Sequence, residues 1–161
     1  MADTNTNEEV RFDSVETLSK AKTLAESRVK LIRSLLEDGE IGDEQYRKIQ
    51  ILYDEARADV NAGLDRLLVE LETTSSQGTI EPYDRVAQRA AERTAQFLKI
   101  SDQVIFGKDR GILELGMKLA DSLIKAFVDI WKVLRGEKTE RHTLLLQRIE
   151  SLKWGEFSEV K

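Results

Sequence analysis

The acidic sequence DGEI at residues 38–41 is one place where residue types and spacing could bind a metal ion, because it resembles the middle of a calcium-binding EF-hand loop. If Gly39 takes the sixth loop position, Ser34, Leu36 and Gln45 fall on the first, third and twelfth positions. Calcium needs carboxylate ligands there, with a bidentate glutamate at the last position. The sequence therefore predicts an acidic turn between two helices rather than a calcium site.

Phosphate loops and multi-histidine metal sites are excluded by single residues. Gly111 and Gly116 have phosphate-loop spacing, but Met117 stands where the loop requires a lysine. His142 is the only histidine, which removes di-iron and zinc sites that need two or more. The chain has no cysteine, and so no thiolate chemistry and no disulfide. We expect no catalytic residue, no cofactor, no metal ligand and no enzymatic activity, with His142 facing solvent.

Three arginines form the one basic row that suggests ligand binding. Arg85, Arg89 and Arg93 follow at steps of four, which places their guanidinium groups along one helix face. One interpretation is a solvated face paired to acids on a neighbouring helix. The other is a contact for an anion or a carboxylate-rich partner. The sequence leaves both open.

Six charges of alternating sign follow one narrow line between residues 112 and 134, within about 80° of helix circumference. We expect them to pair along their own helix. Almost every other position in this segment is apolar or small, so other helices, another copy or lipid must cover it. The charges are Glu114, Lys118, Asp121, Lys125, Asp129 and Lys132. The candidate assembly or membrane-facing residues are Ile112, Leu115, Leu119, Leu123, Phe127, Ile130, Trp131 and Leu134.

The elements that carry these residues are predicted to be helices only. Apolar residues recur at steps of three and four, and one proline in 161 residues leaves long helices uninterrupted. Asp13 with Glu16 resembles a capping box, and Pro82 suits the first turn of a helix. The expected fold is an all-α antiparallel bundle of four long helices and a short fifth, with helix 112–134 central. The predicted helices span residues 13–37, 43–72, 82–106, 109–135 and 139–153.

The chain is predicted to form one domain at residues 12–157. A polar tail at residues 1–11 is expected to be disordered, and residues 158–161 are expected to fray. The aromatic sequence WGEF at residues 154–157 should tuck against the body. The N-terminus does not resemble a signal peptide, and no apolar run is long enough for a conventional membrane span, so a cytoplasmic location is expected.

A net charge of −5 argues against nucleic acid as a partner. We expect a non-catalytic protein that acts through protein–protein interaction, as a scaffold or adaptor or as a self-assembling homo-oligomer. One alternative is a membrane-active bundle that releases helix 112–134 for insertion. A second is an acidic inhibitor or immunity-type protein, whose carboxylates near residues 37–44 bind a basic partner.

Overall fold

The computed structural model describes the backbone at residues 2–72, 82–107, 112–135 and 141–161, and the side chains at residues 13–69, 82–107, 119–135 and 143–161. Every regular element in these ranges is a helix. The elements are α1 (Ala2–Glu37), α2 (Asp43–Glu72), α3 (Tyr83–Phe106), α4 (Ile112–Leu134), α5 (Arg141–Ser151) and the short 3₁₀ helix η1 (Phe157–Glu159).

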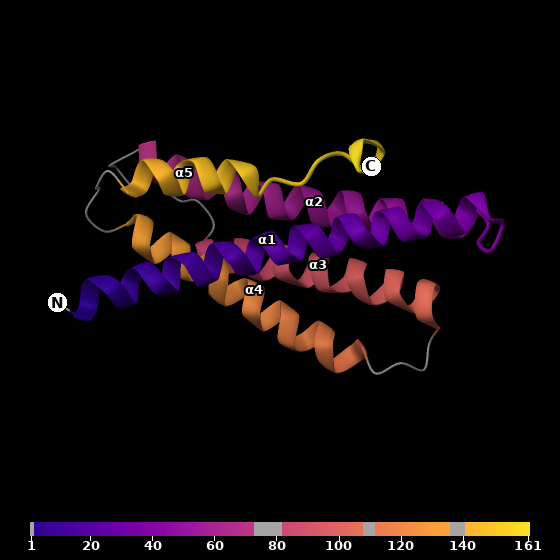
Figure 1. The fold of residues 1–161 in the computed structure, drawn as a ribbon, viewed down its shortest axis with the longest axis horizontal. Coiled ribbons are helices and arrows are strands. Elements are labelled where there is room, and N and C mark those ends of the chain that lie inside the picture. The colour runs from indigo at the N-terminus through magenta and orange to yellow at the C-terminus, as the bar shows by residue number, and fades with distance from the viewer. Residues whose placement is uncertain (1, 73–81, 108–111, 136–140) are drawn as a thin grey trace.

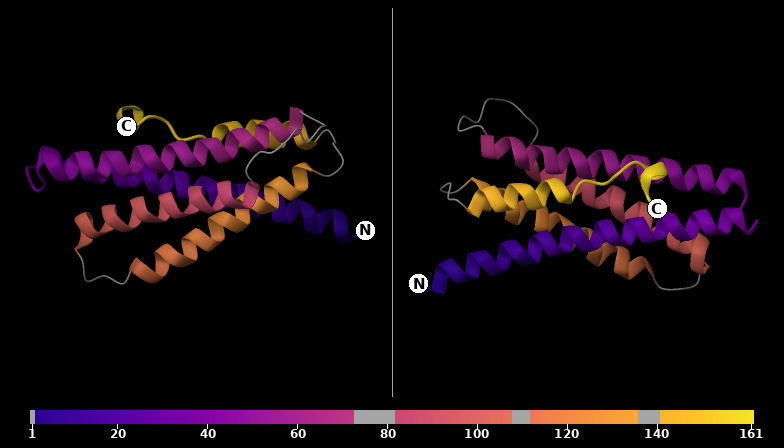
Figure 2. Two further views of the ribbon diagram at one scale, coloured as in Figure 1. Left: turned by 180° about the vertical axis from the view of Figure 1, so that it is seen from behind. Right: turned by 45° about the horizontal axis from the view of Figure 1, so that its top comes forward.

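The four long helices run alternately up and down, and each of them contacts the other three (Figure 1). This confirms the all-α bundle. Helix α4 packs against all three other long helices, as expected, and the same is true of α1, α2 and α3. Helix α5 lies against α2 on the outside of the bundle (Figure 2).

Both chain ends differ from the sequence-based expectation. Helix α1 begins at Ala2, so the backbone expected to be a disordered tail is helical, and Asp13 lies inside the helix instead of capping it. The reason is that residues 2–38 contain neither glycine nor proline to end a helix. At the other end Val160 is only 4% exposed, so residues 158–160 are held against the body and do not fray.

The turn between α1 and α2 is a helix cap, which confirms the predicted hairpin. Gly39 adopts a φ of 74°, the left-handed conformation that glycine tolerates best. The Glu40 amide donates to the Leu35 carbonyl oxygen at 2.9 Å, as expected of a Schellman motif. The predicted linker at residues 73–81 and the break at 108–111 lie outside the described residues.

Small residues let α3 approach its neighbours closely. Ala87, Ala90 and Ala91 are fully buried along its inner face. An ion pair joins Asp102 of this helix to Arg28 of α1, and both side chains are largely withdrawn from water. The Arg28 guanidinium also lies over the Phe106 ring, 5.3 Å from its centroid. Because a buried charge is costly unless paired, this contact fixes α3 against α1.

Helix α4 buries its apolar side inside its own chain. Leu123, Phe127, Ile130 and Leu134 are at most 2% exposed, whereas Leu119 and Trp131 are half-buried. The side chains of Ile112 and Leu115 lie outside the described residues, as does that of His142. The four buried residues of α4 could contact another copy or a membrane only if α4 left the bundle. Among the described residues, no helix combines the length and apolar composition needed to cross a membrane.

Candidate partner-binding groove

The last of the three predicted arginines contacts acids of a neighbouring helix. Arg93 pairs with Glu55 at 2.7 Å and with Asp59 at 3.6 Å, both on α2. Arg85 and Arg89 lie exposed on the same face of α3. At Arg93 the guanidinium therefore serves contact between two helices, in agreement with the first of the two interpretations.

The charged stripe of α4 does not pair along its own helix where its side chains are described. Asp121, Lys125 and Lys132 are exposed and Asp129 is half-buried, and the ion pairs recorded there join none of them to each other. Glu114 and Lys118 lie outside this range. The expected pairing fails because an exposed pair gains only a few tenths of a kcal/mol, which hydration and side-chain entropy offset.

A different site is formed by residues 152–160, which we call the C-terminal segment, and by the α1–α2 surface beneath it, which we call the C-terminal groove. Leu152, Trp154, Phe157 and Val160 are each 3–4% exposed. Glu156 and Ser158 between them are exposed. The segment, which includes η1, therefore presents apolar side chains inward and polar side chains outward.

Aromatic contacts hold the two largest anchors of the segment. The Trp154 ring stacks on Tyr53 of α2, with centroids 5.4 Å apart and planes at 28°. Phe157 meets Tyr53 and Tyr46 edge to face, at 5.5 Å and 5.4 Å. Tyr53 in turn touches Phe97 of α3 at 5.5 Å, so the groove is continuous with the core.

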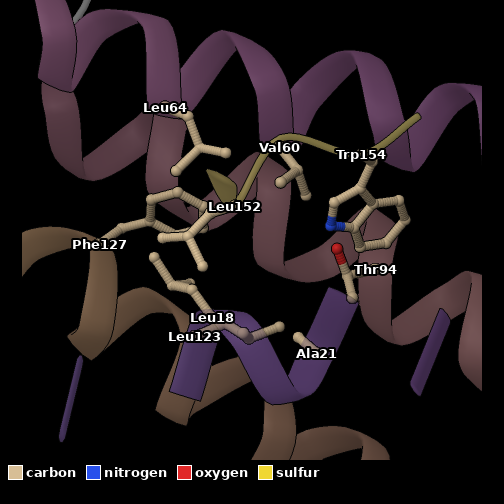
Figure 3. Close-up of a pocket in the computed structure, with 9 residues that line it drawn as sticks. All are labelled: Leu18, Ala21, Val60, Leu64, Thr94, Leu123, Phe127, Leu152 and Trp154. Atoms are coloured by element: carbon tan, nitrogen blue, oxygen red, sulfur yellow. The ribbon is translucent and has the colours of Figure 1, made fainter. Parts of the chain in front are cut away.

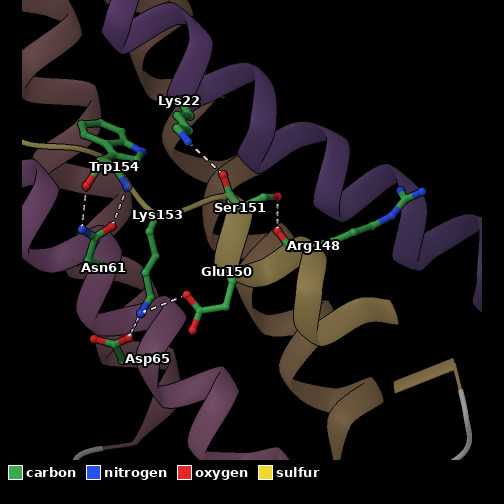
Figure 4. Close-up of polar contacts among 8 residues, drawn as sticks. All are labelled: Lys22, Asn61, Asp65, Arg148, Glu150, Ser151, Lys153 and Trp154. Carbon is green, nitrogen blue, oxygen red and sulfur yellow. Dashed lines mark hydrogen bonds and ion pairs between the residues drawn. The ribbon is translucent and has the colours of Figure 1, made fainter. Parts of the chain in front are cut away.

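Side chains of α1 and α2 bind the backbone of the segment. Asn61 donates to the Trp154 carbonyl oxygen at 3.0 Å and accepts from the Trp154 amide at 2.8 Å (Figure 4). Arg57 donates to the same carbonyl at 3.1 Å. The Tyr53 hydroxyl donates to the Gly155 carbonyl at 2.6 Å. Arg33 of α1 donates to the carbonyls of Phe157, at 2.9 Å, and of Val160.

Two lysines bind the chain where it leaves α5. Lys22 of α1 donates to the Ser151 carbonyl oxygen at 2.8 Å (Figure 4). Lys153 pairs with Asp65 of α2 at 2.7 Å, and this hydrogen bond raises the pKa of its ammonium group. The start of the segment is therefore attached to both helices that form the groove.

Burial has a clear electrostatic effect at Tyr53. Loss of solvent around the phenol, assisted by the nearby Glu26 carboxylate, raises the pKa of Tyr53 to about 12. The hydroxyl therefore keeps its proton at neutral pH and remains a donor to Gly155. Its role in the groove is hydrogen bonding.

A small cavity lies beneath Trp154, where side chains from all four long helices meet Leu152 and Trp154 (Figure 3). It has about 10 Å³ of space for the centre of a water molecule. Its lining is apolar except for the Thr94 hydroxyl and the Trp154 indole. It is too small for a substrate and shows that the segment closes one side of the core. The lining residues are Leu18, Ala21, Val60, Leu64, Thr94, Leu123, Phe127, Leu152 and Trp154.

Sequence reasoning found only part of this groove. The aromatic run at residues 154–157 signalled contact with the body, and that contact is present. The donors lie far back in the chain: Tyr53, for example, precedes Gly155 by 102 positions. No local spacing relates them to the segment.

No family model, curated protein or solved structure matches this chain. Its function is inferred from the geometry of the molecule alone.

Proposed function

We propose that the protein is a non-catalytic helical interaction module that binds a short peptide segment of a partner protein in the C-terminal groove. The observation that carries this proposal is the recognition of the C-terminal segment through its backbone carbonyls by Arg33, Tyr53, Arg57 and Asn61. Donors fixed on helices can bind the backbone carbonyls of any chain that follows the same path, while the contacts of its side chains select its sequence. In the free protein the chain's own C-terminal segment occupies the groove.

The partner segment resembles the occupant in its chemistry. It places a large aromatic side chain on Tyr53 and a second one three residues later, against Tyr46 and Tyr53, as Trp154 and Phe157 do. A small residue follows the first anchor, because Gly155 occupies that place. The tethered occupant competes at an effective concentration on the order of millimolar, so the partner binds once the C-terminal segment detaches.

The test uses the full chain with its own segment weakened. The double variant Trp154→Ala/Phe157→Ala should bind a fluorescently labelled peptide of residues 151–161, as measured by fluorescence anisotropy. We expect its affinity for the peptide to be at least about 100-fold higher than that of the unmodified protein. A peptide carrying the same two alanines should not bind. Glu156→Ala/Ser158→Ala, which changes exposed side chains of the segment, is the matched control and should behave like the unmodified protein. A double variant that is folded but does not bind the peptide would contradict the proposal.

Hydrogen exchange on the unmodified protein gives a second test if the double variant does not fold. The amides of Trp154 and Val160 should exchange through a local opening that costs less free energy than global unfolding. If these amides exchanged only by global unfolding, the C-terminal segment would be a permanent part of the core, and the proposal would be overturned.

A further inference from the structure

A polar cleft between α1 and α4 lies apart from the C-terminal groove. Its volume is about 220 Å³, and it opens to the surface. Helix α1 contributes Asp13, Ser14 and Thr17 to its lining. Helix α4 contributes Ser122, Lys125, Ala126 and Asp129. All of these except Ala126 are polar, in contrast to the apolar cavity beneath Trp154.

The cleft holds charges that form no recorded ion pair with another side chain in the described part of the protein. Asp13, Lys125 and Asp129 give it two carboxylates and one ammonium group. The ion pairs recorded in the described part of the chain include none of these three. Three charges of both signs around one hollow can therefore all be used by a ligand.

The floor and wall supply further hydrogen-bonding groups. Ser14 also lines the cleft, and this residue is only 6% exposed. The Thr17 hydroxyl donates to the Asp13 carbonyl oxygen at 2.8 Å, so its oxygen remains an acceptor. A bound ammonium group could use that acceptor together with a carboxylate.

The direction of the helices gives the cleft a polarity. Helices α1 and α4 run antiparallel (Figure 1), so Asp13 near the start of α1 and Asp129 near the end of α4 lie toward the same end. Lys125 is one turn from Asp129 along α4, about 6 Å in axial rise. One end of the cleft therefore carries the two carboxylates, and the lysine follows one turn further along α4.

We propose that this cleft binds a small amino-acid-like zwitterion, with its ammonium group at Asp13 and Asp129 and its carboxylate at Lys125. A single charge of either sign satisfies only part of the lining, whereas a zwitterion complements both ends. The volume is below the usual range for drug-sized ligands, which limits the ligand to a short molecule. This site does not depend on the C-terminal groove.

The probe is 4-aminobutyrate, whose two charged ends are separated by a short flexible chain. In ligand-observed NMR titrations of the full protein it should bind with a dissociation constant on the order of millimolar or below. Butylamine and butyrate, which each keep one charge, should bind at least about tenfold more weakly, because a charge-assisted hydrogen bond is lost.

Variants of charged α4 residues locate the binding. Asp129→Asn and Lys125→Met should each weaken 4-aminobutyrate binding by about tenfold or more. Asp121→Asn and Lys132→Met, on the same helix but outside the cleft lining, are the matched controls and should change nothing. The proposal would be overturned if the unmodified protein did not bind 4-aminobutyrate, or if the control variants lost as much affinity as the cleft variants. It would also be overturned if butylamine bound as tightly as 4-aminobutyrate.

Discussion

Thr94 places a hydroxyl group in the apolar core. Its side chain is fully buried in α3, and its hydroxyl oxygen has no hydrogen-bond partner among the described residues. A buried water needs two to four polar partners, and the cavity around Thr94 is almost wholly apolar. The hydroxyl is therefore a net cost to the folded state.

Replacing this hydroxyl by a methyl group should stabilise the protein. Thr94→Val keeps the shape and the β-branch, so we expect the free energy of unfolding to rise by about 1–2 kcal/mol in urea denaturation. Thr94→Ser, which keeps the hydroxyl and removes the methyl, should lower it by about 1 kcal/mol. A loss of stability in Thr94→Val would mean that the hydroxyl has a partner in the folded protein.

At the scale of elements, one glycine sets how closely α2 and α4 approach. A Cβ at Gly63 would lie 3.2 Å from Cε1 of Phe127, which is 1% exposed. The Gly63 carbonyl also accepts a hydrogen bond from the Tyr83 hydroxyl at 3.0 Å. The backbone of α2 is therefore in direct contact with side chains of two other helices at this point.

Gly63→Ala should lower the free energy of unfolding, even though alanine favours a helix by about 1 kcal/mol over glycine. The added methyl would lie 3.2 Å from the Phe127 ring, which is tighter than an ordinary contact, and this ring is itself buried in the core. In a Phe127→Leu background, the same substitution should become stabilising, so a double-mutant cycle in urea measures the clash. Ala62→Gly, at the exposed neighbouring position, measures the difference in helix propensity between alanine and glycine without a clash. It should lower the free energy of unfolding by about 1 kcal/mol.

At the scale of the whole molecule, two buried tyrosines connect the helices to each other. Tyr53 links α2 to the C-terminal segment, and Tyr83 links α3 to α2 through Gly63 and to α4 by stacking on Trp131 at 5.5 Å. Burial raises the pKa of Tyr53 to about 12 and that of Tyr83 further still. Neither phenolate can donate the hydrogen bond that its phenol makes.

The protein should therefore lose stability in alkali. The pKa of Tyr53 is higher in the folded than in the unfolded chain, so its contribution is complete below pH 10 and falls as the pH rises from 10 to 12. We expect a loss of about 1.4 kcal/mol per pH unit from this residue. Urea denaturation across this range should show a shallower pH dependence for Tyr53→Phe than for the unmodified protein. Equal slopes would contradict the assigned pKa.

Local sequence patterns determined the helices. The start of α2 at Asp43, its end at Glu72 and the position of Pro82 before α3 all follow from turn residues and apolar spacing, because these act within a few residues. The inward placing of Leu123, Phe127 and Ile130 followed from the same spacing. Where local signals were weak, as at Asp13, the absence of a helix breaker decided the outcome, and α1 continued to Ala2.

Only the tertiary structure decided the sites. The groove joins Arg33, Tyr53 and Asn61 to a segment about 100 residues later, and the polar cleft joins Asp13 to Asp129 across two helices. These contacts depend on which helices are neighbours and how they are rotated, and neither is encoded in the spacing along one helix. The sequence alone therefore determined that residues 112–134 form an apolar helix with a charged stripe, and folding determined that the chain itself covers its described apolar side.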